Sequence, residues 1–357
     1  MITIGVDAHK RVHVAIALDD AGRELGRWRG SNSPNGWQEL DYWAKGQGSP
    51  RRWAIEGAWN YGRGLAQHLV VAEEDVYEVN PRWTALGRRI ARKRDKSDRL
   101  DAHAVAVVSL REGATLPHVT VEDDTTVLDL LTTERENALA EATRLRNQIH
   151  QLLLQLDPEY RSHLPCLQTQ AGLRLLESYA TAGGNNLQGE RAAAVRRLAQ
   201  RLRLALAQAE DLANRIRALA RERYSLLTRL CGVNLLTAGA LAGILGPGRR
   251  FASDSQIAAY AGVAPLEASS AGLVRHRLNR GGNRRLNAIL YRVALTQAHY
   301  RPDAKAYLSR RVAEGKTRRE ALRALKRFII RAIWRLWQEC LSTSTEDHSR
   351  EIVSLLT

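Results

Sequence analysis

The chain has 357 residues and a formal net charge of +16, so it is long enough for two or three domains, and its excess of basic residues predicts a polyanionic partner. Its three cysteines, Cys166, Cys231 and Cys340, lie far apart without C-x-x-C spacing. This argues against a zinc site or a disulfide framework and fits a reducing cytoplasm. No signal-peptide pattern or membrane-length apolar stretch is present, so we expect no membrane association and a cytoplasmic, nucleoid-associated bacterial protein.

The N-terminal region predicts an α/β domain. Three strands come first, and helices and strands then alternate, which is the order of the ribonuclease-H-like (RuvC-like) fold. The expected strands are 2–7, 12–18, 24–29, 52–56 and 74–80, and the expected helices are 35–46 and 60–71.

Four acidic residues stand where a metal-dependent nuclease would need them. Asp7 ends the first apolar run, and Glu56 ends the fourth. Asp98 and Asp101 are three apart on a helical stretch, so they share a face. Carboxylates at strand ends project from the edge of a sheet, where ligands usually bind. Four converging carboxylates repel one another unless a cation holds them, and oxygen ligands suit Mg²⁺ or Mn²⁺. The alternative is a set of unrelated surface acids.

A basic stretch leads directly into Asp98. Its residues are Arg82, Arg88, Arg89, Arg92, Lys93, Arg94, Lys96 and Arg99. A phosphodiester substrate would require such charge beside the metal ligands, so Arg88, Arg89, Arg92 and Lys93 are candidate nucleic-acid contacts. The alternative is a solvated basic helix.

Apolar residues recur with alternating spacings of four and three over 126–156 and again over 195–230. Both runs are heptad seams typical of coiled coils, and a turn region separates them. The two helices could pack on each other as a hairpin. We favour assembly between subunits, as a dimer or a tetramer, because the second seam is long.

The region from about 228 onward predicts a mainly helical domain. Gly232 centres a turn between apolar helices, a weak sign of a helix-hairpin-helix-like element that binds phosphate. A serine pair, Ser269 and Ser270, is followed by a basic stretch. That stretch includes Arg275, Arg277, Arg280 and Arg284, all candidate nucleic-acid contacts. Amphipathic helices are expected at 286–298, 303–314 and 317–341, with Trp334 and Trp337 in the core rather than forming a base-stacking platform.

These patterns predict four segments along the chain. Residues 1–115 form the RuvC-like domain and 116–227 the helical coiled-coil region. Residues 228–342 form the C-terminal domain and 343–357 a tail.

Taken together, the motifs resemble those of transposases of the insertion-sequence family numbered one hundred and ten. Ile4-Gly5-Val6-Asp7 is similar to that family's first motif, and Ile55-Glu56-Gly57 with Tyr61 to its second. Lys96-Ser97-Asp98-Arg99-Leu100-Asp101-Ala102 is similar to its third, K-T-D-x-x-D-A. The C-terminal likeness runs from the Gly232 turn through 260–265 and the serine pair to 280–283.

The resemblance implies a RuvC-like domain with a D-E-D-D metal set and a C-terminal domain with a nucleophilic serine. It also implies donor and target DNA as substrates, a covalent serine–DNA intermediate, and a structured RNA, encoded by the element, that pairs with both DNAs. Active sites are then shared between subunits. Asp7, Glu56, Asp98, Asp101 and Ser270 would be catalytic, and the four acids would hold Mg²⁺ or Mn²⁺.

One departure from the family pattern concerns the serine. Family members usually have serine directly before glycine, whereas here Ala271 follows Ser270 and Gly272 comes one residue later. We favour Ser270 as the nucleophile, with Ser269 as the alternative. Two other functions remain open: a structure-specific or junction-resolving nuclease that acts by hydrolysis, and a nucleic-acid-binding protein without catalysis.

Overall fold

The computed structural model describes residues 1–81, 84, 98–167, 169–180, 186–248, 250–264, 266–267, 276–277 and 281–355. The chain divides into two compact units. The first unit comprises 1–126, 226–233 and 244–357, and the second comprises 127–225 and 234–243. Within the described residues, no helix is both long enough and apolar enough to cross a membrane.

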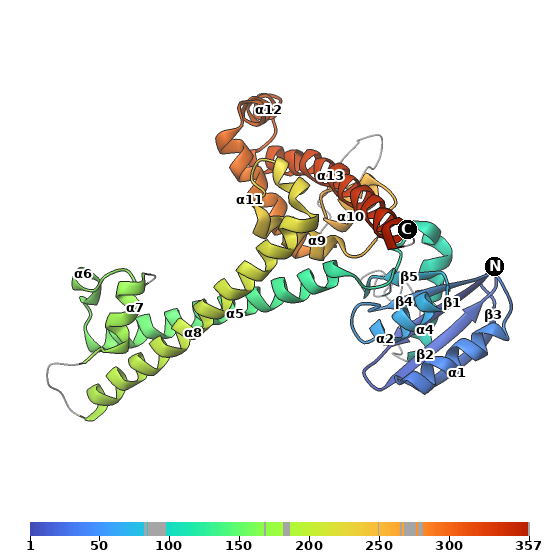
Figure 1. Ribbon diagram of the computed structural model, residues 1–357, viewed down its shortest axis with the longest axis horizontal. Helices are drawn as coiled ribbons and strands as arrows, with labels where there is room; N and C mark the ends of the chain where they lie inside the picture. The colour runs from blue at the N-terminus through green and yellow to red at the C-terminus, as the bar shows by residue number, and fades with distance from the viewer. Residues whose placement is uncertain are drawn as a thin grey trace. The chain divides into compact units, whose positions relative to one another are not determined.

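The first unit contains a five-stranded mixed sheet, drawn in blue in Figure 1. Its strands, in the order β3-β2-β1-β4-β5, are β3 (Glu24–Ser31), β2 (Val12–Leu18), β1 (Ile2–Ala8), β4 (Arg51–Glu56) and β5 (Val76–Val79). The first three pair antiparallel, whereas β1, β4 and β5 are parallel. This sheet fits the ribonuclease-H-like domain that the order of elements predicted.

Helices cover both faces of the sheet, which explains why β1 and β2 are apolar along almost their whole length. On one face, Ile4, Val6 and Ile55 pack against α1 (Pro34–Lys45) and α2 (Arg63–Val71). On the other face, Ile16 packs against α4 (Asp98–Glu112). A short 3₁₀ turn, η1 (Gly113–Thr115), follows α4.

The second unit is built around two long helices, α5 (Asp124–Leu156) and α8 (Asn186–Arg223), which run antiparallel. Side-chain hydrogen bonds join Glu134 to Gln208 and Glu141 to Arg201. Residue numbers therefore increase along α5 in the direction in which they decrease along α8, as expected for antiparallel helices. Shorter helices complete the unit: α6 (Tyr160–His163), α7 (Gln170–Glu177) and the first part of α9 (Leu235–Leu245).

The two heptad seams therefore contact each other within one chain. Leu145 and Ile149 of α5 share a core with Val195 and Leu202 of α8, and Ile216 of α8 is fully buried. A hairpin within one chain, the alternative named in the sequence analysis, explains why these apolar residues are buried. Supercoiling of the helices and assembly between subunits stay predictions.

The C-terminal part of the first unit is mainly helical, as expected. Its elements are η2 (Ser225–Arg229), α10 (Asp254–Tyr260), the two-stranded pair β6 (Leu266–Glu267) and β7 (His276–Arg277), α11 (Arg284–Tyr300), α12 (Pro302–Ala313) and α13 (Arg318–Leu355). Trp337 is 3% exposed, which confirms its predicted place in the core. The last helix continues through most of the segment expected to be a tail. The domain boundaries and the helix-hairpin-helix-like element stay predictions.

Candidate metal centre and the connection to the C-terminal segment

Asp7 and Glu56 are register partners at the ends of the two central parallel strands. Register partners in a sheet point to the same face and lie one strand spacing apart, about 4.8 Å. Asp7 is only 7% exposed, and Glu56 accepts a 3.1 Å hydrogen bond from the Thr84 hydroxyl. The two strand-end acids therefore occupy neighbouring positions on one face of the sheet.

Gly5 allows α4 to approach the strand that carries Asp7. A Cβ atom at position 5 would lie 2.3 Å from the backbone nitrogen of Ala106 and 2.5 Å from the carbonyl oxygen of Ala102. Because side chains alternate along a strand, Asp7 shares the face of Gly5 and points toward this helix. The close contact brings the first turn of α4 to the end of β1. Asp98 and Asp101 lie in that turn, Asp98 exposed and Asp101 buried.

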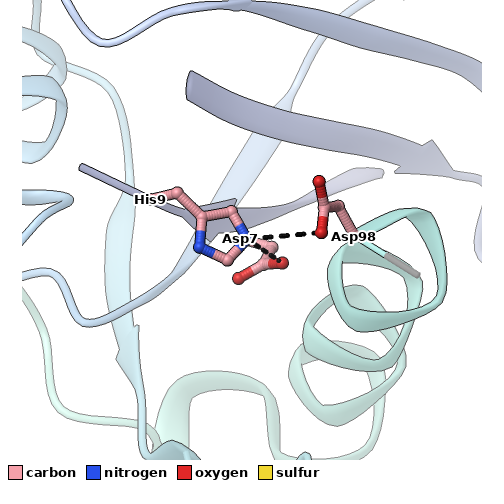
Figure 2. Close-up of side chains that lie close together, drawn as sticks. All are labelled: Asp7, His9 and Asp98. Carbon is pink, nitrogen blue, oxygen red and sulfur yellow. Dashed lines mark ion pairs between the residues drawn. The ribbon is translucent and has the colours of Figure 1, made fainter. Parts of the chain in front are cut away.

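His9 lies between two of the acids, as Figure 2 shows. Its Nε2 atom is 3.0 Å from Asp7 Oδ2 and 3.6 Å from Asp98 Oδ1. One ligand atom from each of these three residues falls within 4.8 Å of the other two. Sequence analysis did not select His9. Its position two residues after Asp7, at the end of an apolar strand, was the available signal, because that spacing keeps two side chains on one side of a strand.

The electrostatics of Asp7 favour neutralisation of its carboxylate. Burial raises the pKa of Asp7, the negative charges of Asp101 and Asp98 raise it further, and His9 opposes them. A divalent cation would relieve the same repulsion. Asp7 and Asp98 offer the hard oxygen atoms that Mg²⁺ and Mn²⁺ prefer, so these side chains fit such an ion, and His9 adds a nitrogen atom beside them. Glu56 and Asp101 lie outside this group of three.

Most of the other predicted site residues lie outside the described residues. These are Ser269, Ser270, Arg275, Arg280, Arg88, Arg89, Arg92 and Lys93. Arg277 belongs to β7, where its backbone pairs with Leu266 of β6. Arg284 is exposed at the first position of α11. Their predicted roles stay predictions.

The two ends of the segment that carries the serine pair are held together. The backbone nitrogen of Asn283 donates to the Tyr260 carbonyl over 2.6 Å, and its side-chain amide donates to the Tyr260 hydroxyl over 2.9 Å. Asn283 also caps α11. Nearby, a Cβ atom on Gly282 would lie 2.2 Å from the nitrogen of Gly262, so the two backbones touch. The segment between residues 264 and 281 therefore begins and ends beside these paired residues. We call Tyr260, Gly262, Gly282 and Asn283 the base of the serine-bearing segment.

Arg250 ties this base to the sheet, and sequence analysis did not select it. Its guanidinium is buried and donates over 2.6 Å to Glu78 on β5. Burial lowers the pKa of Arg250, but Glu78 and Tyr260 together hold that pKa above its ordinary value. The guanidinium carbon also lies 5.0 to 5.6 Å from the ring centroids of Tyr260, Phe251 and Trp59. Because Trp59 is three residues after Glu56, Arg250 joins the acidic end of the sheet to the base of the serine-bearing segment.

Comparisons with known proteins agree in both halves of the chain. A family model described as "Transposase", of the IS110 DEDD type, matches residues 4–158. A second, described as "Transposase IS116/IS110/IS902 family", matches residues 224–309. The chain is also 30% identical over 275 residues to the insertion element IS110 uncharacterized 43.6 kDa protein of Streptomyces coelicolor, covering 65% of this chain and 68% of that protein.

Proposed function

Because the chain belongs to the IS110 family of transposases, we propose that it cuts and rejoins the DNA of an insertion element through a covalent serine–DNA intermediate. Ser270 is the proposed nucleophile. Asp7, Glu56, Asp98 and Asp101 are the proposed ligands of Mg²⁺ or Mn²⁺. The proposal is supported by the paired positions of Asp7 and Glu56 in the sheet and by the closeness of Asp98, on the first turn of α4, to Asp7 and His9.

The acids and the serine have separate tasks in this mechanism. The Ser270 oxygen forms a bond to phosphorus, and the bond from phosphorus to the leaving sugar oxygen breaks. The hydroxyl proton passes to a base, and the leaving oxygen takes up a proton. A bound divalent ion supplies charge stabilisation at the phosphate and at the leaving oxygen. The energy of the phosphodiester is kept in the phosphoserine bond, so a second DNA end can reverse the reaction.

Arginines would support this chemistry by neutralising phosphate charge. Arg275 and Arg277 follow Ser270 closely in sequence, and Arg280 and Arg284 stand before and after Gly282 and Asn283 in sequence. A phosphorane in the transition state carries more negative charge than the substrate, so fixed guanidinium groups lower the barrier. Arg88, Arg89, Arg92 and Lys93 are proposed contacts to the DNA backbone.

An RNA encoded by the element is the proposed source of sequence specificity. When base pairing selects the target, the protein needs to recognise only backbone and shape, and a strong excess of arginine suits that task. The net charge of +16 supports binding of more than one nucleic-acid strand. Oligomers that share active sites between subunits belong to the same proposal.

The metal component can be tested with isosteric variants of the acids. Asp7→Asn, Glu56→Gln, Asp98→Asn and Asp101→Asn should each abolish DNA cleavage and leave DNA affinity nearly unchanged. EDTA should have the same effect, and Mg²⁺ or Mn²⁺ should restore activity. Glu39→Gln, an exposed acid on α1, is the matched control and should cleave normally. Cleavage that persists in EDTA would remove the metal from the mechanism.

A further inference from the structure

Two adjoining hollows lie in the C-terminal part of the first unit, where α12 and α13 pack together. The larger has a volume of about 530 Å³ and the smaller about 320 Å³. Tyr307, Arg310 and Phe328 line both. Both volumes fall in the range of small-ligand sites, so each hollow can receive a group the size of a nucleobase.

The ridge shared by the hollows is aromatic. The rings of Tyr307 and Phe328 meet edge to face, with centroids 5.4 Å apart and an interplanar angle of 78°. Phe328 is 54% exposed, although the chain's only other phenylalanine, Phe251, is 4% exposed. A single exposed ring would need no explanation. Here two rings in contact stand between two hollows, which is an arrangement suited to a flat ligand.

The rim of the hollows is basic. The lining includes one carboxylate, Asp303, and six arginines: Arg229, Arg301, Arg310, Arg311, Arg327 and Arg331. The Arg310 guanidinium carbon lies 5.5 Å from the centroid of the Tyr307 ring. Arg327 is exposed and forms no ion pair with any of the residues that the structure describes.

The acids that pair with these arginines do not cancel the surface charge. Arg301 pairs with Asp303, and Arg331 pairs with Asp254 over 2.9 Å. Glu339 pairs with Arg229, and Glu314 is shared by Arg310 and Arg311, so four acids serve five arginines. Solvent screens exposed ion pairs of this kind, and they contribute little free energy. A phosphate can therefore replace the carboxylates at small cost.

The charge also decides between possible occupants. A second copy of this surface would place arginines against arginines in a symmetric contact, and that repulsion disfavours self-association. A nucleic-acid strand offers the complementary combination, because its phosphates match the arginines and its exposed bases match the rings.

We propose that this ridge, formed by Tyr307 and Phe328, is a binding site for an unpaired DNA strand. Bases stack on the two rings and enter the hollows, while the arginine rim contacts the flanking phosphates. The proposal rests on the proposed function only in taking DNA as the substrate. It needs neither the metal nor the serine.

The stacking component is tested by equilibrium binding of a fluorescein-labelled twelve-residue oligodeoxythymidylate, followed by fluorescence anisotropy in EDTA. Phe328→Ala should weaken binding at least about fivefold, because one base–aromatic stack is lost. Phe328→Leu should weaken binding by a similar factor, since leucine keeps apolar volume but has no ring. Phe328→Trp should bind the oligonucleotide at least as tightly as the natural protein. Val312→Ala shortens a comparably exposed apolar side chain of α12 outside the hollows (48% exposed against 54% for Phe328) and is the matched control.

The phosphate component is tested by salt dependence. Arg327→Gln should reduce the slope of log affinity against log salt by about 0.7, the value for one phosphate contact on a single strand. Arg319→Gln, an exposed arginine of α13 outside both hollows, should leave the slope unchanged. The same oligonucleotide carrying 5-iododeoxyuridine should photocrosslink to Tyr307 or Phe328, as located by mass spectrometry.

Four results would overturn the proposal. They are unchanged affinity of Phe328→Ala, crosslinks that map outside α12 and α13, dependence on these residues for oligouridylate but not for the DNA oligonucleotide, and a change in oligomer mass of Phe328→Ala with DNA binding intact. The third result would assign the site to RNA and the fourth to another copy of the chain. All measurements omit metal, so failure of the serine mechanism leaves them interpretable.

Discussion

Arg250 and Glu78 form a partly buried ion pair across 172 residues of sequence, joining the segment before α10 to strand β5 over 2.6 Å. The Arg250 carbonyl also accepts a hydrogen bond from the backbone nitrogen of His118, and the Arg250 guanidinium donates to the Ile244 carbonyl. The connection thus combines one ion pair, backbone hydrogen bonds and ring contacts. It links residues 1–126 with residues 244–357, which fall in one compact unit.

The first prediction concerns this pair. Arg250→Met keeps much of the side-chain volume but leaves the Glu78 carboxylate without its cation. Because Glu78 is only partly buried, we expect a loss of up to about 3 kcal/mol in the free energy of unfolding, measured by urea denaturation. The double variant with Glu78→Gln should recover part of that loss, because no carboxylate is then left without its cation. Arg331→Met breaks an exposed pair and should cost at most about 1 kcal/mol. Equal losses in both single variants would argue against the connection.

Gly5 gives a second prediction. Gly5→Ala should push α4 away from β1, because the added Cβ would meet backbone atoms at 2.3 Å and 2.5 Å. Asp98 and Asp101 would then withdraw from Asp7. The expected result is loss of Mn²⁺ binding, measured by electron paramagnetic resonance, with the α/β domain still folded.

Gly189→Ala is the matched control for this change. A Cβ atom at Gly189 of α8 would meet no other atom within 4 Å, so the variant should bind Mn²⁺ normally. It should also gain about 0.5 to 1 kcal/mol of stability, since alanine is the better helix residue. Normal Mn²⁺ binding by Gly5→Ala would show that the close contact does not position the acids.

The third prediction concerns the helical hairpin. Leu212→Glu and Ile216→Glu would place charge in a core within the chain, so unfolding of the second unit is expected rather than simple dissociation. Assembly through this unit would use leucines that remain exposed, such as Leu154 of α5 and Leu204 of α8. The double variant Leu154→Lys and Leu204→Lys should lower the mass seen by light scattering with helicity intact. An unchanged mass would exclude these two leucines from any subunit contact.

These residues also show what the sequence could and could not predict. The strands and the neighbouring positions of Asp7 and Glu56 were predictable, because apolar runs mark buried strands and the ends of parallel strands share one edge. The heptad spacing could not identify its partner, since the same pattern serves a helix of the same chain or of another.

The structural role of Arg250 could not be predicted from the sequence, for a different reason. Nothing in its local sequence separates it from the many exposed arginines, and only the packing of distant rings and Glu78 around it reveals its role. A pattern of carboxylates alone omits His9, although its spacing of two residues from Asp7 is visible in the sequence.

The most direct test of the central claim is a search for DNA bound covalently to Ser270. The protein is incubated with labelled element-junction DNA, target DNA, the RNA and Mg²⁺, and is then denatured. We predict that label stays with the protein through a phosphoserine bond, that mass spectrometry places it on Ser270, and that Ser270→Ala loses both adduct and recombination while Ser269→Ala is milder. Label on Ser269 would correct the choice of serine and keep the mechanism. Free 5′-phosphate product without an adduct, together with full activity of the double alanine variant, would contradict the claim and identify a hydrolytic nuclease.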